Sequence, residues 1–411
     1  MGIVKMTGIL WVEESENDFA RTIIKRKDIN LAIIRFSNCL SFSAKHLEET
    51  QNIPTFVINK YGDFEDECTR LHAFLEKLNF EINVFYNDSE FNQVFIQKVS
   101  RRLGLPGALS EYQAQVVRDK LVMKRFIREI GLTCPNYKLL KCTDDLEECI
   151  NEWGFPFIIK WRNGVSSIEV YKVKNREDIS RLALNYRTER YMAEQYLSNK
   201  IWCIDAIVQN GNVISNLYTW LPYTNLSFAE SKEKFTQLAV GHPQNYWKFD
   251  PSNLTQLIIS SLGLGSGYLH LEVFVSDDGQ PSICEFAWRT PGDHMLHNFT
   301  VLYGRSVENM IIDALIGTKL STLPNCNRCV ADVFLPLKAG KIMKLSTIAE
   351  LAKTFNILDG EIYYQIGDDV ANEHKYTNSS GWVQVQSENI TETLNIIDNI
   401  YSSFIFEVEG N

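Results

Sequence analysis

The chain has 411 residues, a net charge of −10 at pH 7, 45% hydrophobic residues and 22% charged residues. A chain of this length can bury the cores of two or three domains, and its composition is that of a globular protein. The acidic balance argues against binding nucleic acid through a broad basic surface, and no apolar run is long enough for a membrane span. We therefore expect neither a nucleic-acid partner nor a membrane partner.

The nine cysteines are scattered and odd in number, which favours a reducing compartment over a disulfide framework. The opening sequence MGIVKMTGILWVEESEND has a short apolar run that acids follow at once, and it lacks a credible signal-cleavage site. It therefore fits a first β-strand better than a secretion signal. We expect a cytoplasmic protein.

Residues 1–105 alternate short apolar runs with amphipathic stretches. The strand-like runs are TGILWVE, LAIIRFS, IPTFVINK and INVFY, and DECTRLHAFLEKLN has a helical pattern. Strands spaced by helical patterns indicate a small parallel α/β domain. The sequence GxGxxG does not occur in it, so the fingerprint of dinucleotide binding is absent.

A second domain is predicted over 106–320, and it contains a smaller unit. Residues 111–131 have a helical pattern throughout and end at Gly131, a residue type typical of helix C-termini. Residues 135–197 combine helical stretches with the strand-like runs FPFIIK, IEVYKVK and YMAEQYL, and they form an α+β unit small enough to be a mobile lid. The fold class that we expect is α/β with an α+β lid. Residues 321–411 are predicted to form a small β-rich appendix closed by a helix.

The run HLEVFVSDDGQPSICEFAWR, from His270 to Arg289, indicates a β-hairpin, because strand patterns flank the turn sequence SDDGQP. The turn folds Glu272 and Glu285 toward each other. Two neighbouring buried carboxylates repel, and their burial is costly unless a cation lies between them. Two interpretations fit this run alone: an exposed, solubilising strand face, or a divalent-metal site with a phosphate-binding Arg289 beside it.

Lys160 ends the run FPFIIK and precedes the polar loop WRNGVSS, which contains Ser166 and Ser167. A point charge beside a loop rich in amides and hydroxyls suits polyphosphate binding. A lysine that snorkels from a strand edge is the alternative. Lys120 lies in the predicted helix, where a solvated helix face explains it equally well.

Glu194 lies in YMAEQYLSN, between a strand and a bend. The backbone of Tyr196 and Leu197 offers an acceptor and a donor that match the edge of an adenine. The Glu194 carboxylate can accept from the exocyclic amine of that base. Taken alone, this signal is weak.

The order of these features resembles the ATP-grasp superfamily, and within it the carboxylate–amine ligases that include bacterial L-amino-acid (dipeptide) ligases. The resemblance covers about 103–317 and is carried by three segments: RRLGLPGALSEYQAQVVRDKLVMKRFIREIGLTCP, GFPFIIKWRNGVSSIEV and LGLGSGYLHLEVFVSDDGQPSICEFAWRTPGD. It implies an N-terminal pre-ATP-grasp domain, a mobile lid and a catalytic subdomain built on an antiparallel sheet.

The resemblance also implies roles for the residues above. It assigns ATP binding to Lys120, Lys160, Ser166, Ser167, Glu194, Tyr196 and Leu197. It makes Glu272 and Glu285 the ligands of magnesium, with two ions expected and manganese as a substitute. Arg289, together with Lys160, is implied to stabilise the transferred phosphoryl group.

Three positions depart from the pattern of the family. Ile201 stands where many members have a ribose-contacting glutamate, and Ala287 stands where a metal-site asparagine is common. Gly164 is the single glycine of a lid loop in which relatives often have several. These departures leave the ribose contacts, the second ion and the geometry of the loop open.

Three further residues near the hairpin are candidate substrate contacts: His270, His294 and Arg305. His270 alternates with Glu272, so both side chains point to one face of the strand. The alternative for His270 is a histidine of the core. The alternative for Arg305 is a surface charge at the start of a helix.

The function that we expect is an ATP-dependent ligase that activates a carboxylate, such as that of an amino acid, as an acyl phosphate. The acceptor is an amine, or alternatively the thiol of an acyl carrier protein, as in the ligase that loads glutamate in butirosin-type antibiotic assembly. Lys338, Lys341 and Lys344 form a local basic run that suits such a carrier, and a solvated edge is the alternative for this run. A non-catalytic nucleotide-binding module is the third alternative, and a homodimer is among the expected assemblies.

Overall fold

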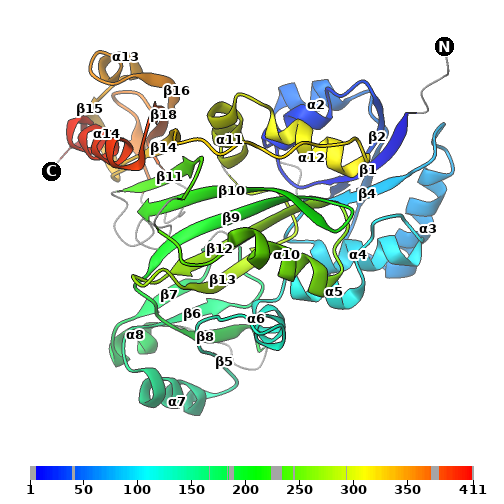
Figure 1. Cartoon of the computed structure of the whole chain (residues 1–411), viewed down its shortest axis with the longest axis horizontal. Coiled ribbons are helices and arrows are strands. Elements are labelled where there is room, and N and C mark those ends of the chain that lie inside the picture. The colour runs from blue at the N-terminus through cyan, green and yellow to red at the C-terminus, as the bar shows by residue number, and fades with distance from the viewer. Residues whose placement is uncertain are drawn as a thin grey trace.

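The computed structural model describes residues 6–38, 42–165, 167–182, 184, 189–223, 234–243, 246–292, 294–371 and 379–409. Its strands form a parallel sheet at the N-terminal end, a small lid sheet, a long central sheet and a three-stranded sheet near the C-terminus. Figure 1 shows the N-terminal domain on one side of the central sheet, with the lid below and the C-terminal elements at the far end.

The N-terminal domain is a parallel α/β unit, as predicted. Its strands lie in the order β3-β2-β1-β4 and all pair in parallel. They are β1 (Thr7–Glu13), β2 (Ile29–Phe36), β3 (Thr55–Ile58) and β4 (Val84–Asn87), and the helices are α1 (Asp18–Ile23), α2 (Ala44–Thr50), α3 (Phe64–Leu75) and α4 (Gln93–Arg102). The carboxyl ends of β1 and β4 lead directly into residues that reach the candidate site.

The predicted helix over 111–131 is wrong in one respect, because the structure breaks it in two. It forms α5 (Glu111–Val116) and α6 (Lys120–Glu129), separated by a three-residue break. Asp119 causes the second start, since its side chain accepts hydrogen bonds from the backbone N–H groups of Leu121 and Val122. The break places Arg118 and Lys120 beside the lid loop.

Within its described residues, the lid is a four-stranded antiparallel sheet with the helices α7 and α8. Its strands lie in the order β5-β8-β6-β7. The elements are β5 (Tyr137–Leu139), α7 (Thr143–Trp153), β6 (Phe157–Trp161), β7 (Val170–Val173), α8 (Arg176–Arg181) and β8 (Tyr191–Gln195). Leu140, Phe157 and Ile159 belong to a hydrophobic cluster of the lid's own, as expected for a unit that can move as a body.

The central sheet has eight antiparallel strands in the order β13-β12-β9-β10-β11-β14-β18-β16. Five come from the middle of the chain: β9 (Lys200–Gln209), β10 (Asn212–Tyr223), β11 (Phe235–Val240), β12 (Gly267–Val275) and β13 (Pro281–Ala287). The predicted C-terminal appendix supplies the other three: β14 (Cys329–Leu335), β16 (Ile357–Ile362) and β18 (Gly381–Ser387). The C-terminal segment therefore extends the central sheet.

The remaining elements cover this sheet or complete the C-terminal end. They are α10 (Pro251–Leu262), α11 (Met295–Tyr303), α12 (Val307–Leu315), α13 (Ile348–Leu351), α14 (Ile390–Ser403), and the small sheet of β15 (Gly340–Leu345), β17 (Asp369–Val370) and β19 (Phe406–Val408).

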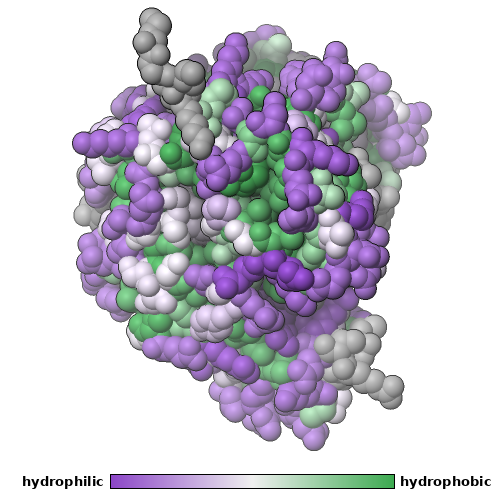
Figure 2. All heavy atoms as spheres, turned by 90° about the vertical axis from the view of Figure 1, so that its right-hand side faces the viewer, coloured by the Kyte–Doolittle hydropathy of each residue, from purple (hydrophilic) through white to green (hydrophobic). Residues whose placement is uncertain are grey.

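One hydrophobic core joins the N-terminal domain to the rest of the molecule. Trp11, Phe19 and Tyr86 of that domain pack in a single buried cluster with residues of α11 and α12, among them Phe299. The face that carries the N-terminal domain is mostly polar, with apolar side chains in smaller groups between the polar ones (Figure 2). None of the helices within the described residues combines the length and the apolar character that crossing a bilayer demands.

Candidate active site

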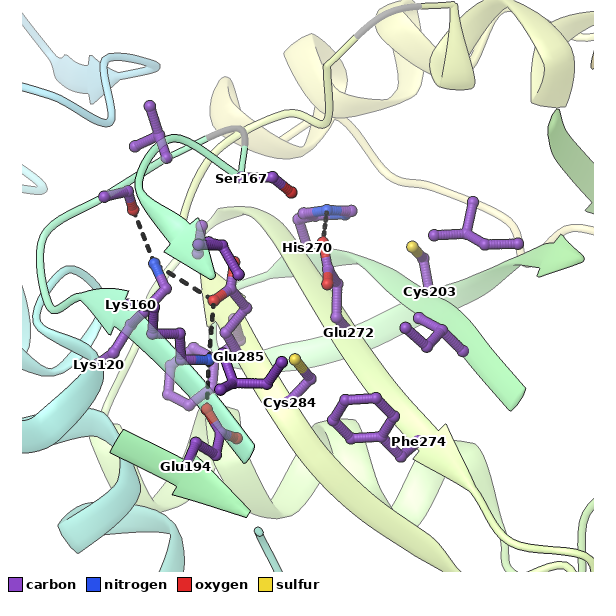
Figure 3. Close-up of a pocket in the computed structure, with 18 of the residues that line it drawn as sticks. Lys120, Lys160, Ser167, Glu194, Cys203, His270, Glu272, Phe274, Cys284 and Glu285 are labelled. Carbon is purple, nitrogen blue, oxygen red and sulfur yellow. Dashed lines mark hydrogen bonds and ion pairs between the residues drawn. The ribbon is translucent and has the colours of Figure 1, made fainter. Parts of the chain in front are cut away.

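A cavity of about 680 Å³ lies between the lid and the central sheet. Side chains from α6, from β6 and β8 of the lid, and from β9, β12 and β13 of the central sheet line it. In Figure 3 Lys120 and Lys160 point toward Glu194 and Glu285, whereas Glu272 points toward His270.

The predicted hairpin is present, and Glu272 and Glu285 are direct cross-strand partners. The register then shifts between Glu272 and Val273, so that Cys284 is an extra residue in a β-bulge. The carbonyl oxygen of Cys284 accepts a hydrogen bond of 2.9 Å from Nζ of Lys124. Because the bulge takes the Cys284 carbonyl out of the regular hydrogen-bond ladder between the two strands, this oxygen can accept from the buried Lys124.

Two lysine ammonium groups face the Glu285 carboxylate. Lys120 Nζ lies 3.2 Å from Glu285 Oε2, and Lys160 Nζ lies 4.0 Å from the same oxygen. Burial raises the pKa of the Glu285 carboxyl, but the charges of Lys120 and Lys160 outweigh it and lower that pKa to about 2. Glu285 is therefore ionised at neutral pH.

Glu194 is buried between two lysines. Its Oε1 lies 2.7 Å from Lys124 Nζ, and Lys160 contacts its other oxygen. Burial raises the pKa of Glu194, and the lysine charges reverse this effect and leave the pKa lowered. Both carboxylate oxygens are thus engaged, and the adenine role of Glu194 stays a prediction.

Arg289 contacts the N-terminal domain. Its Nε donates to Glu90 Oε2 at 2.6 Å, and Asp88 accepts from the backbone and hydroxyl of Thr290 at 2.8 Å each. Burial lowers the pKa of the Arg289 guanidinium, but the charge of Glu90 outweighs it and leaves that pKa raised. The loop after β4 therefore holds the predicted phosphate-binding arginine in place.

His270 points to the same side as Glu272, as the alternation predicts. Its Nδ1 lies 2.7 Å from Asp205 Oδ1, Tyr268 donates to Asp205 Oδ2 at 3.0 Å, and Nε2 lies 3.8 Å from Glu272 Oε1. Burial lowers the pKa of His270, but Asp205 outweighs it and raises that pKa to about 10. The imidazole is thus a fixed cation that lines the cavity beside Glu272.

The lid loop is fastened to the break between α5 and α6. Nζ of Lys120 donates to the carbonyl of Gly164 at 2.7 Å, and Arg118 donates to the carbonyl of Asn163. The guanidinium of Arg162 forms an ion pair of 2.6 Å with Asp119. Three consecutive residues, from Arg118 to the first residue of α6, therefore hold three consecutive residues of the loop.

The other half of the cavity is mainly apolar. Ile201, Cys203, Leu221, Phe235 and Met295 line it and belong to one buried cluster. The same cluster contains Phe334 of β14 and Trp382 of β18, so the C-terminal strands back this wall.

The structure brings most of the predicted site residues together. Those that line the cavity are Lys120, Lys160, Ser167, Glu194, Tyr196, Leu197, His270, Glu272, Glu285 and Arg289, with Ile201 and Ala287 beside them. Ser166 lies outside the described residues.

Two of the candidate substrate contacts lie elsewhere. The ring of His294 stacks on Trp382 at 4.2 Å between centroids, and exposed Arg305 donates to Ser321 at 2.9 Å. Neither is among the described residues that line the cavity.

Five residues of the site were not predicted from the sequence: Glu90, Arg118, Lys124, Asp205 and Cys284. Glu90 follows a strand of another domain, so no local pattern links it to Arg289. Lys124 lies one helical turn after Lys120, and that spacing was a usable signal, because residues four apart share one face of a helix.

The donor set fits magnesium bound together with a nucleotide. Two in-register carboxylates supply oxygen, the donor atom that magnesium prefers, and phosphate oxygens usually complete its octahedron. No cluster of three or more histidine, cysteine or acidic side chains suited to a metal occurs in the part of the chain that the structure describes. The hairpin is thus suited to share an ion with a ligand.

Comparison with known proteins identifies the fold. The chain matches no protein-family model. A curated relative, N5-carboxyaminoimidazole ribonucleotide synthase of Staphylococcus haemolyticus, is 28% identical over 144 residues, which are 34% of this chain and 36% of that protein. The alignment thus spans about a third of the relative's length.

Solved structures match nearly the whole chain. L-amino acid ligase from Bacillus licheniformis superposes with a TM-score of 0.75 at 16% identity, over 99% of this chain and 100% of that one. N5-carboxyaminoimidazole ribonucleotide synthetase from Thermotoga maritima gives a TM-score of 0.64 at 17% identity, over 98% and 100%. These neighbours are ATP-grasp ligases, so the ATP-grasp fold expected from the motifs is confirmed.

Proposed function

We propose that this chain, which has the fold of the ATP-grasp ligases, is an ATP-dependent carboxylate–amine ligase. A carboxylate oxygen attacks the terminal phosphorus of ATP, ADP leaves, and an acyl phosphate forms. The amine nitrogen then attacks the acyl carbon, phosphate leaves with the electron pair of the broken C–O bond, and the nitrogen loses a proton. The products are an amide, ADP and phosphate.

One observation supports this proposal above all: a single cavity gathers the cations and carboxylates that phosphoryl transfer needs. Lys120 and Lys160 face Glu285, one of the two carboxylates proposed to bind magnesium, and Arg289 lines the same cavity. Phosphoryl transfer depends mainly on positioning and on neutralising charge, so the protein itself need supply no nucleophile. Magnesium at Glu272 and Glu285 would neutralise charge on the transferred phosphoryl group.

The apolar half of the cavity supports a small organic acid as the substrate. Cys203, Leu221 and Phe235 line the cavity that Glu272, Glu285 and Arg289 also line. A carbon skeleton would pack against this apolar wall with its carboxylate toward Arg289. A closed lid would keep water from the acyl phosphate. An amino acid is the carboxylate that we propose.

A free amine is the acceptor that we propose. The basic run suited to a carrier protein lies at β15, in the small C-terminal sheet, where Lys344 pairs with Glu407 at 2.8 Å. In Figure 1 that sheet lies with the C-terminal elements, beyond β14 and β18, whereas β13 and β12 form the other edge of the central sheet. Its distance from the hairpin favours a small acceptor over a docked carrier.

The test is release of ADP and phosphate from ATP and Mg²⁺ with a panel of amino acids, with products weighed by mass spectrometry. We expect an amide of two panel members. Glu285→Gln should lower the rate at least about 100-fold, because it removes one of two ligands to the ion that clamps the reacting phosphate. Near-normal turnover of the variant would contradict the metal role, and ADP release only with a carrier protein would contradict the acceptor.

A further inference from the structure

Arg118 is a buried cation of the cavity that the proposed chemistry has not yet used. It lies in the break between α5 and α6, two residues before Lys120, and it lines the cavity. Arg118 is 6% exposed. One guanidinium nitrogen donates to the carbonyl of Asn163 in the lid loop, whereas Nη1 is buried with no hydrogen-bond partner among the described residues.

An unsatisfied donor on a buried charged group is costly, so a partner for Nη1 is expected. The acidic groups whose charges act on Arg118 are Glu90, Glu14 and Glu285. Each forms another contact: Glu90 binds Arg289, Glu285 binds Lys120, and Glu14 Oε2 accepts from the backbone N–H of Glu90 at 2.6 Å. Glu14 Oε1 is buried without a hydrogen-bond partner among the described residues, and Arg118 does not reach it within ion-pair distance. No ion pair of Arg118 occurs within the described residues, so the open position suits an anion from outside the chain.

The neighbours of Arg118 indicate which anion this is. Its guanidinium acts electrostatically on Glu285, the metal-type carboxylate, and on Glu90, the residue that holds Arg289. In the proposed reaction, the metal at Glu285 and the guanidinium of Arg289 both serve the phosphoryl group that moves. The terminal phosphate of ATP would therefore lie between this metal and Arg289.

We propose that Nη1 of Arg118 binds the terminal phosphoryl group of ATP while Nη2 holds the lid-loop carbonyl of Asn163. The inference rests on the proposed ATP-dependent function. The planar fork of arginine presents separate N–H donors to both acceptors in a fixed geometry. Arg118 thereby ties the position of the lid loop to the presence of the phosphate that is transferred.

The test compares two nucleotides by titration calorimetry with Mg²⁺: ADP, and adenylyl imidodiphosphate, which carries a terminal phosphate that is not transferred. Arg118→Met should weaken the affinity for the imidodiphosphate about 10- to 100-fold, the range of one charge-assisted hydrogen bond. Its affinity for ADP should change less than about threefold on the same scale. Arg125→Met, which removes an exposed arginine of α6, should change neither.

The outcomes separate the alternatives. Equal weakening of both nucleotides would assign Arg118 to the lid loop alone and overturn the inference, as would no weakening at all. A wild-type protein that binds neither nucleotide would overturn the proposed function itself. If Arg118→Met fails to fold, as melting curves show, Arg118→Lys carries the test, and selective weakening of the imidodiphosphate is again the expected result.

Discussion

At the scale of single residues, buried lysines determine the charge state of the carboxylates in the site. Lys124 and Lys160 both contact Glu194, and Lys124 is fully buried. A buried charge is tolerated only when partners replace its lost hydration. The same pairing keeps Glu194 ionised, so its contribution to stability depends on pH.

We predict that Glu194→Gln lowers the free energy of unfolding at neutral pH and that the loss disappears in acid. The pKa of Glu194 is lowered in the folded protein, because its lysine partners outweigh the effect of burial. The pairing therefore stabilises the fold above the unfolded pKa of about 4.3, and this gain is lost as pH falls through the lower folded value.

Urea unfolding of both proteins from pH 7 downward measures this difference. The control is Glu147→Gln: Arg176 also lowers the pKa of Glu147, but that ion pair is exposed and should contribute little. A difference in free energy of unfolding between wild type and Glu194→Gln that does not narrow as the pH falls below the unfolded pKa would contradict the prediction.

At the scale of elements, the break between α5 and α6 is the feature that fastens the lid loop. Asp119 caps α6 and also pairs with Arg162 of the loop, so one carboxylate serves both the helix start and the loop. The backbone N–H of Lys120 donates to the carbonyl of Arg162 at 3.1 Å as well. Movement of the lid loop must therefore strain or release the start of α6.

We predict that Asp119→Ala speeds amide hydrogen exchange of residues 162–164 in the nucleotide-free protein. Loss of the cap should also lower the free energy of unfolding by about 1 kcal/mol. Asp63→Ala is a matched control, because Asp63 caps α3 with the same pair of backbone hydrogen bonds but lies in the N-terminal domain. It should cost similar stability and leave exchange in the loop unchanged; equal exchange in both variants would refute the coupling.

At the scale of the whole molecule, the N-terminal domain and the central sheet share a core. Phe19 and Trp11 pack in one cluster with Phe299 of α11, and Arg26 forms a 2.8 Å ion pair with Asp313 of α12. The same junction carries the contact between Glu90 and Arg289. The two parts should therefore unfold together.

We predict that Phe299→Ala lowers the free energy of unfolding by about 3–5 kcal/mol, because it leaves a large cavity in this shared core. Tryptophan fluorescence and far-ultraviolet circular dichroism should give the same lowered midpoint in denaturant. Phe64, which is partly buried against the N-terminal domain's own cluster, offers the control Phe64→Ala with a smaller loss. Separate transitions in the Phe299 variant would show that the parts unfold independently.

The sequence by itself determined several strands and the hairpin that pairs Glu272 with Glu285. Strand periodicity located β1, β6 and β12, and the turn SDDGQP made Glu272 and Glu285 partners, because these signals lie within a few residues of one another. Only the tertiary structure decided which distant residues contact the hairpin and the arginine that follows it. Glu90 reaches Arg289 from another domain, and Lys124 reaches Cys284 through a bulge. Such contacts join residues far apart in the chain, so their energies depend on packing that no local pattern encodes.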